Sequence, residues 1–388
     1  MTLVTTYQPL PISFTHGSGV WLYDKEGEAY LDSFSGIAVN GLGHAHPDVT
    51  QTIQQQAAKL IHTSNAFVIE EQLALAEKLT HLTGMKQAFF GNSGAEANES
   101  AIKLSRLYGH KQGIETPSII VTDGAFHGRT MATLTASGSR KVQAGFEPLL
   151  PGFIRAPFDD IDAIHTIASH RDDVVAVMLE PIQGEGGIRV ASGAYLRALA
   201  DLCEKQNWLL IMDEIQTGNG RTGALFVSMG MGLQPDILTT AKGLGNGMPI
   251  SVCLMRDRAC DLFKPGNHGS TFGGNPLACA TALTVLNVIE RDHLCEKVAS
   301  MGVILKSKLI EALGDNPAIR GIRGKGYMLG IELDRPANGL KIIGLKHRIL
   351  LNIAAESTIR LLPPLVMSED EMSLLIKRLV ASVHEFLG

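Results

Sequence analysis

Residues 87–108 read QAFFGNSGAEANESAIKLSRLY, and this stretch decides the expected fold. A short apolar run ends in a turn of small and polar residues at Gly91–Gly94. In the segment that follows, Ala97, Ala101 and Leu104 recur at intervals of four and three residues, which puts them on one face of a helix. The stretch therefore predicts a strand, a turn and a helix in succession.

The same alternation continues through the middle of the chain. Further apolar runs, bounded by Gly, Pro, Asp or Asn, are expected as buried strands at Ser118–Thr122, Val174–Leu179, Leu209–Met212 and Ile237–Thr240. Buried strands that are separated by helical patterns are typical of an α/β fold with a mostly parallel sheet.

The two ends of the chain differ from this pattern. Residues 14–32 contain two strand-like runs around Gly27, which predict a hairpin. From about residue 285 the chain has long amphipathic stretches and a strand candidate at Tyr327–Leu333, which favour a smaller α+β domain. A chain of 388 residues is long enough for two domains. The expected division is a large domain of residues 51–284 and a small domain of residues 285–388, to which residues 1–50 contribute.

Composition and charge exclude several classes of protein. Apolar residues make up 45% of the chain and charged residues 19%, as in ordinary globular proteins. A formal net charge of −5 provides no basic surface for nucleic acid or for a membrane. The first cationic residue is Lys25, whereas a secretory or transit peptide needs positive charge near its start. We therefore expect a cytoplasmic protein.

The cysteines and histidines give little sign of a metal or disulfide. Five cysteines are present and no CxxC pair occurs, so we expect reduced thiols rather than a disulfide framework or a zinc site. His44 and His46 are two residues apart and lack a third ligand nearby, so we interpret them as structural and expect no metal.

In open α/β sheets, ligands bind beyond the carboxyl ends of the strands, so the residues that follow each strand are candidates for a site. Ser93, Gly94 and Ala95 stand where a strand gives way to a helix. Free N–H groups and the helix dipole favour a phosphate at such a position. The GK[ST] ending of a nucleotide-binding loop is absent. The alternative is an ordinary capped turn.

Two further strand ends carry charged side chains. Asp213 follows the apolar run Leu209–Met212, and a carboxylate there is unfavourable to bury unless it is paired. The alternatives for Asp213 are a capped turn or a magnesium ligand. Lys242 lies just past Ile237–Thr240, and a lysine withdrawn from water becomes a nucleophilic amine. Taken alone, Lys242 is more simply explained as an ordinary exposed lysine.

The three strand ends together suit one cofactor, pyridoxal 5′-phosphate (PLP). It needs a phosphate site, a carboxylate against its ring nitrogen and an amine that bonds to it covalently. Gln216 could reach the phenolic oxygen of the ring. Phe126 offers a flat face for stacking, Arg129 offers a clamp for a carboxylate, and the loop His268–Pro276 offers hydroxyls.

These motifs resemble a known family. The segments NSGAEANE, FHGRT, EPIQGEGG, DEIQTGNGRTG, AKGLG, HGSTFGGNP and IRLLPPL occur in the order and spacing of the class III aminotransferases of PLP fold type I. The likeness covers roughly residues 14–365 and is closest to the branch that contains acetylornithine aminotransferases. One departure is Asn219 in TGNGRTG, where the family more often has a methionine or a similar residue, and we expect little effect from it.

The resemblance implies a role for each cofactor residue. Lys242 and Asp213 would be the catalytic residues, with Lys242 bonded to the cofactor and Asp213 paired with its ring nitrogen. The remaining cofactor contacts would be Ser93, Gly94, Ala95, Phe126, Glu214, Gln216 and Thr271. In this family Thr271 reaches the cofactor phosphate of the neighbouring subunit, which implies a homodimer with a shared active site.

The resemblance also implies substrate contacts. Arg360 would bind the α-carboxylate of glutamate, and Glu185 would pair with Arg360 when the other amino donor is present. Arg129 would take the second carboxylate, and Ser270 would lie near the substrate. Members that act on free ornithine typically carry a tyrosine where this chain has Ser35–Ile37, so its absence favours N-acetylornithine.

The expected reaction is therefore transamination between N-acetylornithine and 2-oxoglutarate, which gives N-acetylglutamate 5-semialdehyde and glutamate in arginine biosynthesis. Ornithine, N-succinyldiaminopimelate and 4-aminobutyrate are alternative donors. Racemases, decarboxylases and aminomutases share the same cofactor site. A non-enzymatic PLP-binding regulator would usually carry an added DNA-binding module, and the sequence has no such pattern.

Overall fold

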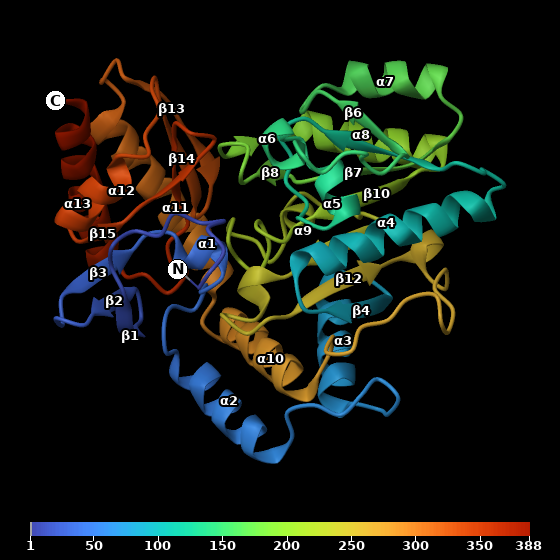
Figure 1. Ribbon diagram of the computed structural model, residues 1–388, viewed down its shortest axis with the longest axis horizontal. Helices are drawn as coiled ribbons and strands as arrows, with labels where there is room; N and C mark the ends of the chain where they lie inside the picture. Colours follow the sequence, from blue (N-terminus) through green and yellow to red (C-terminus); the bar gives the residue numbers. More distant parts are fainter. Residues whose placement is uncertain (1) are drawn as a thin grey trace.

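A seven-stranded sheet forms the centre of the larger part of the molecule. The computed structural model describes residues 2–388. The strand order is β4-β12-β11-β10-β7-β5-β6 (Figure 1). In that order the strands span Gln87–Gly91, Ser251–Met255, Ile237–Thr240, Leu209–Asp213, Val174–Leu179, Ser118–Thr122 and Phe153–Ala156. Only β12 runs antiparallel to its neighbours, so the sheet is mostly parallel.

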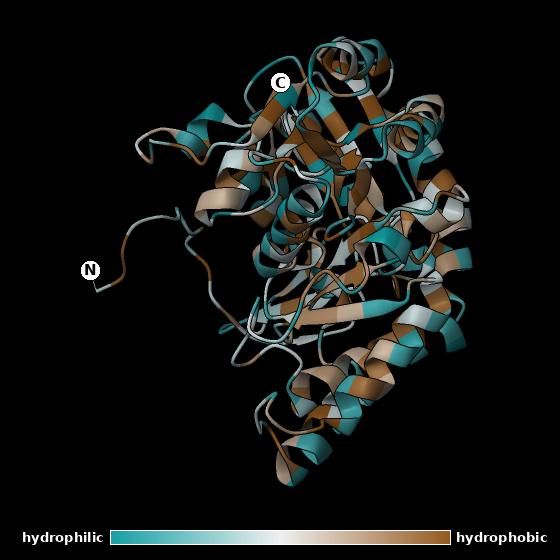
Figure 2. Cartoon of the chain, turned by 90° about the vertical axis from the view of Figure 1, so that its right-hand side faces the viewer, coloured by the Kyte–Doolittle hydropathy of each residue, from teal (hydrophilic) through white to brown (hydrophobic). Residues whose placement is uncertain are grey.

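Helices cover both faces of this sheet. On one face lie α4 (Gly94–Lys111) and α5 (Met131–Ala136). On the other face lie α3 (Glu70–Thr83), α7 (Ile161–His170), α8 (Gly193–Gln206) and α10 (Pro276–Arg291). Figure 2 shows the apolar residues gathered on the central strands and on the helix surfaces that face them. Burial of apolar surface on both faces is what makes the strands almost wholly hydrophobic.

The C-terminal part of the chain has its own sheet and core. The strands β13, β14, β17 and β16 form an antiparallel sheet in that order. They span Ile319–Lys325, Met328–Leu333, Thr358–Leu361 and Asn352–Ala354. Its core is completed by α11 (Leu294–Leu313), α12 (Leu340–Lys346) and α13 (Glu369–Leu387).

The N-terminal strands lie beside this C-terminal part (Figure 1). The strands β1, β2 and β3 span Phe14–Ser18, Trp21–Asp24 and Ala29–Asp32 and form antiparallel pairs, which confirms the expected hairpin. The last of them, β3, pairs in parallel with β15 (Ile349–Leu350). This pairing supports the proposed division, in which residues 1–50 contribute to the small domain formed by residues 285–388.

The remaining elements are short, apart from α2. They are α1 (Ser35–Ala38), α2 (Pro47–Lys59), α6 (Arg140–Gln143), α9 (Val227–Gly230), the 3₁₀ turns η1 (Lys242–Leu244) and η2 (Asp257–Ala259), and the strands β8 (Ile182–Gln183) and β9 (Arg189–Val190). Within residues 2–388, no helix combines the length and the apolar character that crossing a membrane would require.

The expected α/β class, the mostly parallel sheet and the five central strands are confirmed, and β10 extends one residue further to include Asp213. Two strands of the sheet were not expected from the sequence, β6 and β12. Only residues 241–250 separate β11 from β12. A parallel crossover needs a dozen or more residues, usually with a helix, so β12 has to return antiparallel.

Substitution of Gly302 provides a test of the packing in the C-terminal part of the chain. Gly302 lies inside α11, and a Cβ there would be 2.5 Å from the Gly326 Cα in the turn between β13 and β14. An isolated helix gains about 0.5–1 kcal/mol when glycine becomes alanine. Because the obstacle here is backbone, we expect Gly302→Ala to lower the free energy of unfolding by about 1–3 kcal/mol instead.

Urea denaturation measures this change. The matched control is Val303→Ala, because Val303 is the next residue on the same helix and is 67% exposed. We expect the control to change stability by less than about 0.5 kcal/mol. A Gly302→Ala variant as stable as the parent protein would contradict the close approach of the two backbones.

Candidate active site

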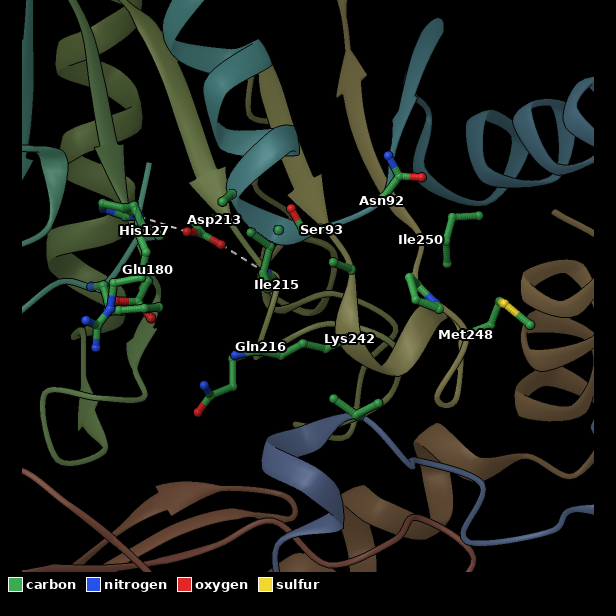
Figure 3. Close-up of a pocket in the computed structure, with 18 of the residues that line it drawn as sticks. Asn92, Ser93, His127, Glu180, Asp213, Ile215, Gln216, Lys242, Met248 and Ile250 are labelled. Carbon is green, nitrogen blue, oxygen red and sulfur yellow. Dashed lines mark hydrogen bonds and ion pairs between the residues drawn. The ribbon is translucent and has the colours of Figure 1, made fainter. Parts of the chain in front are cut away.

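A cavity of about 380 Å³ lies at the carboxyl ends of the central strands (Figure 3). The structure brings eight of the expected site residues together in its wall: Ser93, Gly94, Ala95, Phe126, Arg129, Asp213, Gln216 and Lys242. They come from segments up to about 150 residues apart in the chain, because parallel strands end at the same edge of the sheet.

The carboxylate of Asp213 is buried at the end of β10 and fully paired. Asn98 Nδ2 donates to its Oδ2 at 2.7 Å, and His127 Nδ1 lies 2.7 Å from the same oxygen. The backbone N–H of Ile215 donates to Oδ1 at 3.1 Å. Figure 3 shows the carboxylate held between His127 and Ile215. A buried charge requires such partners, so Asp213 is oriented before any ligand binds.

Sequence reasoning missed Asn98 and His127. Both stand inside quoted motifs, NSGAEANE and FHGRT, but neither follows a strand end directly. His127 Nε2 is buried and has no hydrogen-bond partner among residues 2–388. The sequence did indicate that a buried Asp213 needs polar partners. It did not indicate which segments of the chain would provide them.

Lys242 begins the 3₁₀ turn η1, directly after β11 and Ala241. Its φ of +44° is in the left-handed region, which non-glycine residues seldom adopt. Asn219 Nδ2 donates to Thr240 Oγ1 at 3.0 Å and to the Ala241 carbonyl at 3.2 Å, and so supports this turn. Asn219 also has φ of +57°, a conformation that asparagine tolerates well.

The amine of Lys242 lies among charged groups. Burial lowers the pKa of Lys242 below the ordinary value for lysine, and Arg360 lowers it further. The carboxylates of Glu185, Glu180 and Asp213 raise the same pKa without cancelling the effect of burial. A lowered pKa leaves more of the amine in its neutral, nucleophilic form near neutral pH.

The turn before α4 also lines the cavity. Ser93 is the N-cap of this 18-residue helix, and its Oγ accepts from the Glu96 N–H at 3.3 Å. A Cβ on Gly94 would lie 2.8 Å from the Ile215 side chain, so only glycine fits there without a shift of that side chain. Ser93 thus caps the helix, as in the alternative of an ordinary capped turn. The start of α4 nevertheless faces the cavity.

Phe126 and Arg129 line the cavity on the side of β5. The Phe126 N–H donates to Glu180 Oε2 at 2.8 Å, and the Arg129 guanidinium lies 5.6 Å from the centre of the Phe126 ring. Glu180 is buried, lines the same cavity and was not expected from the sequence. Burial, together with the charge of Asp213, raises the pKa of Glu180 to about 7.

Glu185 and Arg360 form an ion pair next to the cavity. Arg360 Nη1 donates to Glu185 Oε1 at 2.5 Å and to Gln216 Oε1 at 3.2 Å. Arg360 Nε donates to Asn352 Oδ1 at 2.9 Å. Burial raises the pKa of Glu185, but the charge and hydrogen bond of Arg360 outweigh it, so the net pKa lies below the ordinary value. Since Gln216 lines the cavity, the pair adjoins it directly.

Glu214 does not contact the cavity, contrary to the expectation. Its two carboxylate oxygens accept from the N–H groups of Val227 and Ser228 and from the hydroxyls of Thr217 and Ser228. Its own N–H donates to the Thr239 carbonyl. Alternation along the chain explains the error, because successive side chains at a strand end point to opposite faces. Asp213 faces the cavity, and Glu214 faces the start of α9.

Ser270 and Thr271 lie in the exposed loop before α10. Ser270 Oγ accepts from Asn92 Nδ2 at 3.2 Å and from the Gly273 N–H at 2.9 Å. Asn92 lines the cavity, so Ser270 stands at its edge. Thr271 is exposed rather than part of the cavity wall of its own chain.

The cysteines and His44 lie outside the cavity wall. All five cysteines are free. His44 Nε2 lies within hydrogen-bond distance, 2.8 Å, of Asp32 Oδ2, so this ring nitrogen has a partner within the protein. No group of three or more side chains suited to hold a metal ion was found within residues 2–388.

Comparison with known proteins identifies the family. The family model of class-III aminotransferases matches residues 3–383. The chain belongs to this family. Class-III aminotransferases depend on PLP and have fold type I. An acetylornithine aminotransferase from Nitrosomonas europaea is 49% identical over 385 residues, which cover 99% of this chain and 98% of the relative.

Solved structures agree with this assignment. An ornithine aminotransferase from Toxoplasma gondii, described with partial occupancy of PLP at its active site, is 33% identical with a TM-score of 0.94. That match covers 98% of this chain and 92% of the other. An acetylornithine aminotransferase from Elizabethkingia anophelis is 35% identical with a TM-score of 0.88. That match covers 99% of this chain and 96% of the other.

The structural role of Glu214 can be tested directly. Glu214→Ala would leave several buried donors without an acceptor, and each buried unpaired group costs about 1–3 kcal/mol. We expect the free energy of unfolding to fall by roughly 2–5 kcal/mol in a denaturant titration of the cofactor-free protein. Glu204→Ala, at a glutamate with 82% side-chain exposure, is the control and should change little. An unchanged stability in Glu214→Ala would contradict the structural role that these hydrogen bonds assign to it.

Proposed function

We propose that the chain transfers an amino group from N-acetylornithine to 2-oxoglutarate, with PLP as cofactor. The observation that carries the proposal is the meeting of Lys242, Asp213 and the Ser93–Ala95 turn in one cavity, with the Glu185–Arg360 pair beside it. The products would be N-acetylglutamate 5-semialdehyde and glutamate. The full-length likeness to acetylornithine aminotransferases supports the choice of donor.

The residues of the cavity fit PLP. The start of α4, at Ser93–Ala95, would hold the phosphate through free N–H groups and the helix dipole. Asp213 would pair with the ring nitrogen, because its carboxylate is buried, oriented and acceptor-only. Phe126 would stack on the ring, and Gln216 would lie near the phenolic oxygen. Lys242 would bond covalently to the cofactor.

When bound, PLP supplies an electron-accepting ring that stabilises negative charge on the substrate carbon next to the amino group. Asp213 keeps the ring nitrogen protonated, so that the ring retains this capacity. Once the amino group of the substrate has replaced it on the cofactor, the freed Lys242 amine would carry the proton from that substrate carbon to the cofactor, and its lowered pKa favours the neutral form that this requires. Asn98 and His127 hold Asp213 in place throughout, and are positioning residues.

Two arginines suit the carboxylates of the substrates. Arg360 would bind the α-carboxylate of glutamate, and the exposed Arg129 would take the second carboxylate. For the other donor, Glu185 would stay paired with Arg360 and neutralise it. A buried guanidinium needs a partner in either case, so Glu185 and a substrate carboxylate compete for the same cation.

The segment before α2 bears on the choice of donor. Residues Ser35–Ile37 contain no tyrosine, which favours N-acetylornithine over free ornithine. Ile37 packs against a small apolar cluster that includes Ile182 and Ile188 of the β8–β9 hairpin. Solved ornithine aminotransferases share the fold, so ornithine is the alternative donor that a direct comparison has to exclude.

We further propose that the enzyme is a homodimer in the cytoplasm and serves arginine biosynthesis. Thr271 would contribute to the cofactor phosphate of the partner subunit, because it is exposed and stands apart from the cavity of its own chain. The exposed apolar residues Phe67, Val68 and Phe272 support an interface in this region, since large exposed apolar side chains that gather near a site mark binding surfaces.

The lysine and the donor can be tested together. We expect the purified protein with PLP to form glutamate from 2-oxoglutarate and N-acetylornithine, and to do so less efficiently with ornithine, N-succinyldiaminopimelate or 4-aminobutyrate. Lys242→Ala should lower turnover by roughly 10²–10⁴-fold, because it removes the group that moves the proton. Lys86→Ala is the control, since Lys86 pairs only with Asp257 at the surface.

Mass spectrometry after borohydride reduction locates the cofactor. We expect its mass on the peptide that contains Lys242. Cofactor on another peptide, or full turnover by Lys242→Ala, would overturn the assignment of this lysine. A donor other than N-acetylornithine with the highest kcat/KM would replace the proposed substrate and leave the lysine assignment intact.

The Glu185–Arg360 pair predicts a selective effect on the two half-reactions. Glutamate has to displace Glu185 from Arg360, whereas N-acetylornithine does not. In Glu185→Gln, the ratio of kcat/KM for N-acetylornithine to that for glutamate should therefore fall roughly tenfold, since a hydrogen bond between charged groups contributes about 1.5 kcal/mol or more. Single-turnover absorbance of the cofactor measures each half-reaction separately.

The control for this prediction is Glu356→Gln, because Glu356 is an exposed glutamate whose ion pair with Lys141 lies at the surface. It should leave the ratio unchanged. Equal losses with both donors in Glu185→Gln would show that Glu185 does not choose between them.

A further inference from the structure

Glu185 lies in a small hairpin that cannot be rigid by itself. The strands β8 and β9 pair only through Ile182 with Val190 and Gln183 with Arg189. Residues 184–188 connect them. An isolated hairpin of this size is marginal in water, so its shape depends on contacts with the rest of the protein. The 2.5 Å hydrogen bond between Glu185 and Arg360 therefore depends on contacts that hold the hairpin in a defined position.

Arg323 of β13 holds the end of this connection. Its Nε donates to the carbonyls of Gly187 and Ile188 at 3.1 Å each, and its Nη2 donates to Gly187 at 2.6 Å. Its Nη1 pairs with Glu332 of the neighbouring strand β14. The guanidinium is thus fixed by its own sheet on one side and binds the hairpin backbone on the other.

Three residues in one row of the small sheet receive the hairpin. Arg323 pairs across the sheet with Gly330, and Gly330 pairs with Arg360. Residues that are directly opposite on neighbouring strands point to the same face. Arg323 and Arg360 therefore flank Gly330 on one face, and each binds the same hairpin.

The glycine at the centre of this row makes room for the hairpin. A Cβ on Gly330 would lie 2.8 Å from the Ile188 Cβ. Ile188 is fully buried and has φ of +56°, a strained conformation for a β-branched residue. Such a conformation persists only where surrounding contacts enforce it. Two contacts enforce it here: the Ile188 side chain packs against Gly330, and Arg323 binds the carbonyls of Gly187 and Ile188.

We propose that Arg323 is a positioning residue that holds Glu185 against Arg360, and thereby sets how readily Arg360 exchanges Glu185 for a substrate carboxylate. The inference rests on the proposed exchange between two amino donors. Arg323 does not line the cavity. It acts through the carbonyls of Gly187 and Ile188, two and three residues along the chain from Glu185.

The direction of the effect follows from the geometry. Without Arg323 the hairpin loosens and the Glu185–Arg360 pair weakens, so glutamate has less to displace. Arg323→Met, which keeps length but removes the donors, should therefore lower the kcat/KM ratio of N-acetylornithine to glutamate, as Glu185→Gln does. We expect a shift of roughly tenfold, since displacement of a reacting group by about 1 Å has effects of this order or larger.

Two further variants separate positioning from general damage. Arg323→Lys keeps the positive charge and a single donor nitrogen, so the ratio should shift less than in Arg323→Met. If Arg323→Met is poorly folded, Arg323→Lys takes its place in the comparison. Arg189→Met is the matched control: Arg189 lies on the same hairpin, but its guanidinium stacks 5.3 Å from the Phe158 ring. The ratio in Arg189→Met should stay unchanged.

A double variant provides the decisive comparison. If Arg323 acts through Glu185, then Arg323→Met should cause no further shift of the ratio in a Glu185→Gln background. Additive shifts would overturn the proposal, and so would equal losses in both half-reactions of Arg323→Met. Each ratio is measured by single-turnover absorbance, with thermal denaturation to confirm that the variants are folded.

Hydrogen exchange tests the same idea without turnover. In the cofactor-free protein, Arg323→Met should speed exchange of the backbone amides of residues 184–188, and Arg189→Met should not. Unchanged exchange in Arg323→Met would overturn the proposal. If N-acetylornithine is not a donor, the proposed function fails, but exchange and the ratio of glutamate to whichever donor is accepted still decide the role of Arg323.

Discussion

The buried carboxylate of Asp213 is the constraint on which the rest of the site depends. A charge at the end of an apolar strand is tolerated only with polar partners, and the protein supplies them from α4 and from the segment after β5. Meeting that requirement brings the start of α4 to the same edge of the sheet as Lys242. The packing that stabilises Asp213 therefore also assembles the wall of the cavity.

The C-terminal part of the chain meets this site through a second charged group, the guanidinium of Arg360. Arg360 is almost wholly buried and reaches Gln216 of the cavity wall and Glu185 of the β8–β9 hairpin. The hairpin is seated on the row formed by Arg323, Gly330 and Arg360. One sheet thus carries both Arg360, which pairs with Glu185, and Arg323, which binds the backbone of the same hairpin. In the function that we propose, this arrangement makes substrate choice depend on the packing between the two parts of the chain.

The strand ends and the family likeness together pointed to eight of the nineteen residues that line the cavity, and the likeness also implied Glu214, which lies outside it. Asp213 and Glu214 are adjacent, and both belong to a motif that the family likeness singles out. Their side chains point to opposite faces, so one enters the cavity and the other caps α9. Asn98, His127 and Glu180 were missed for a related reason. Each acts as a partner of another buried group, and partners of that kind are chosen by packing rather than by position along the chain.

The sequence by itself determined the α/β class, the five central strands and the residues at their carboxyl ends, because periodicity and strand termination are local properties. It also carried the family likeness, since motif order is independent of packing. The tertiary structure alone decided that β12 runs antiparallel, that Glu214 turns away from the cavity and that Arg323 holds the hairpin of Glu185. These features depend on contacts between segments far apart in the chain, and no local pattern encodes such contacts.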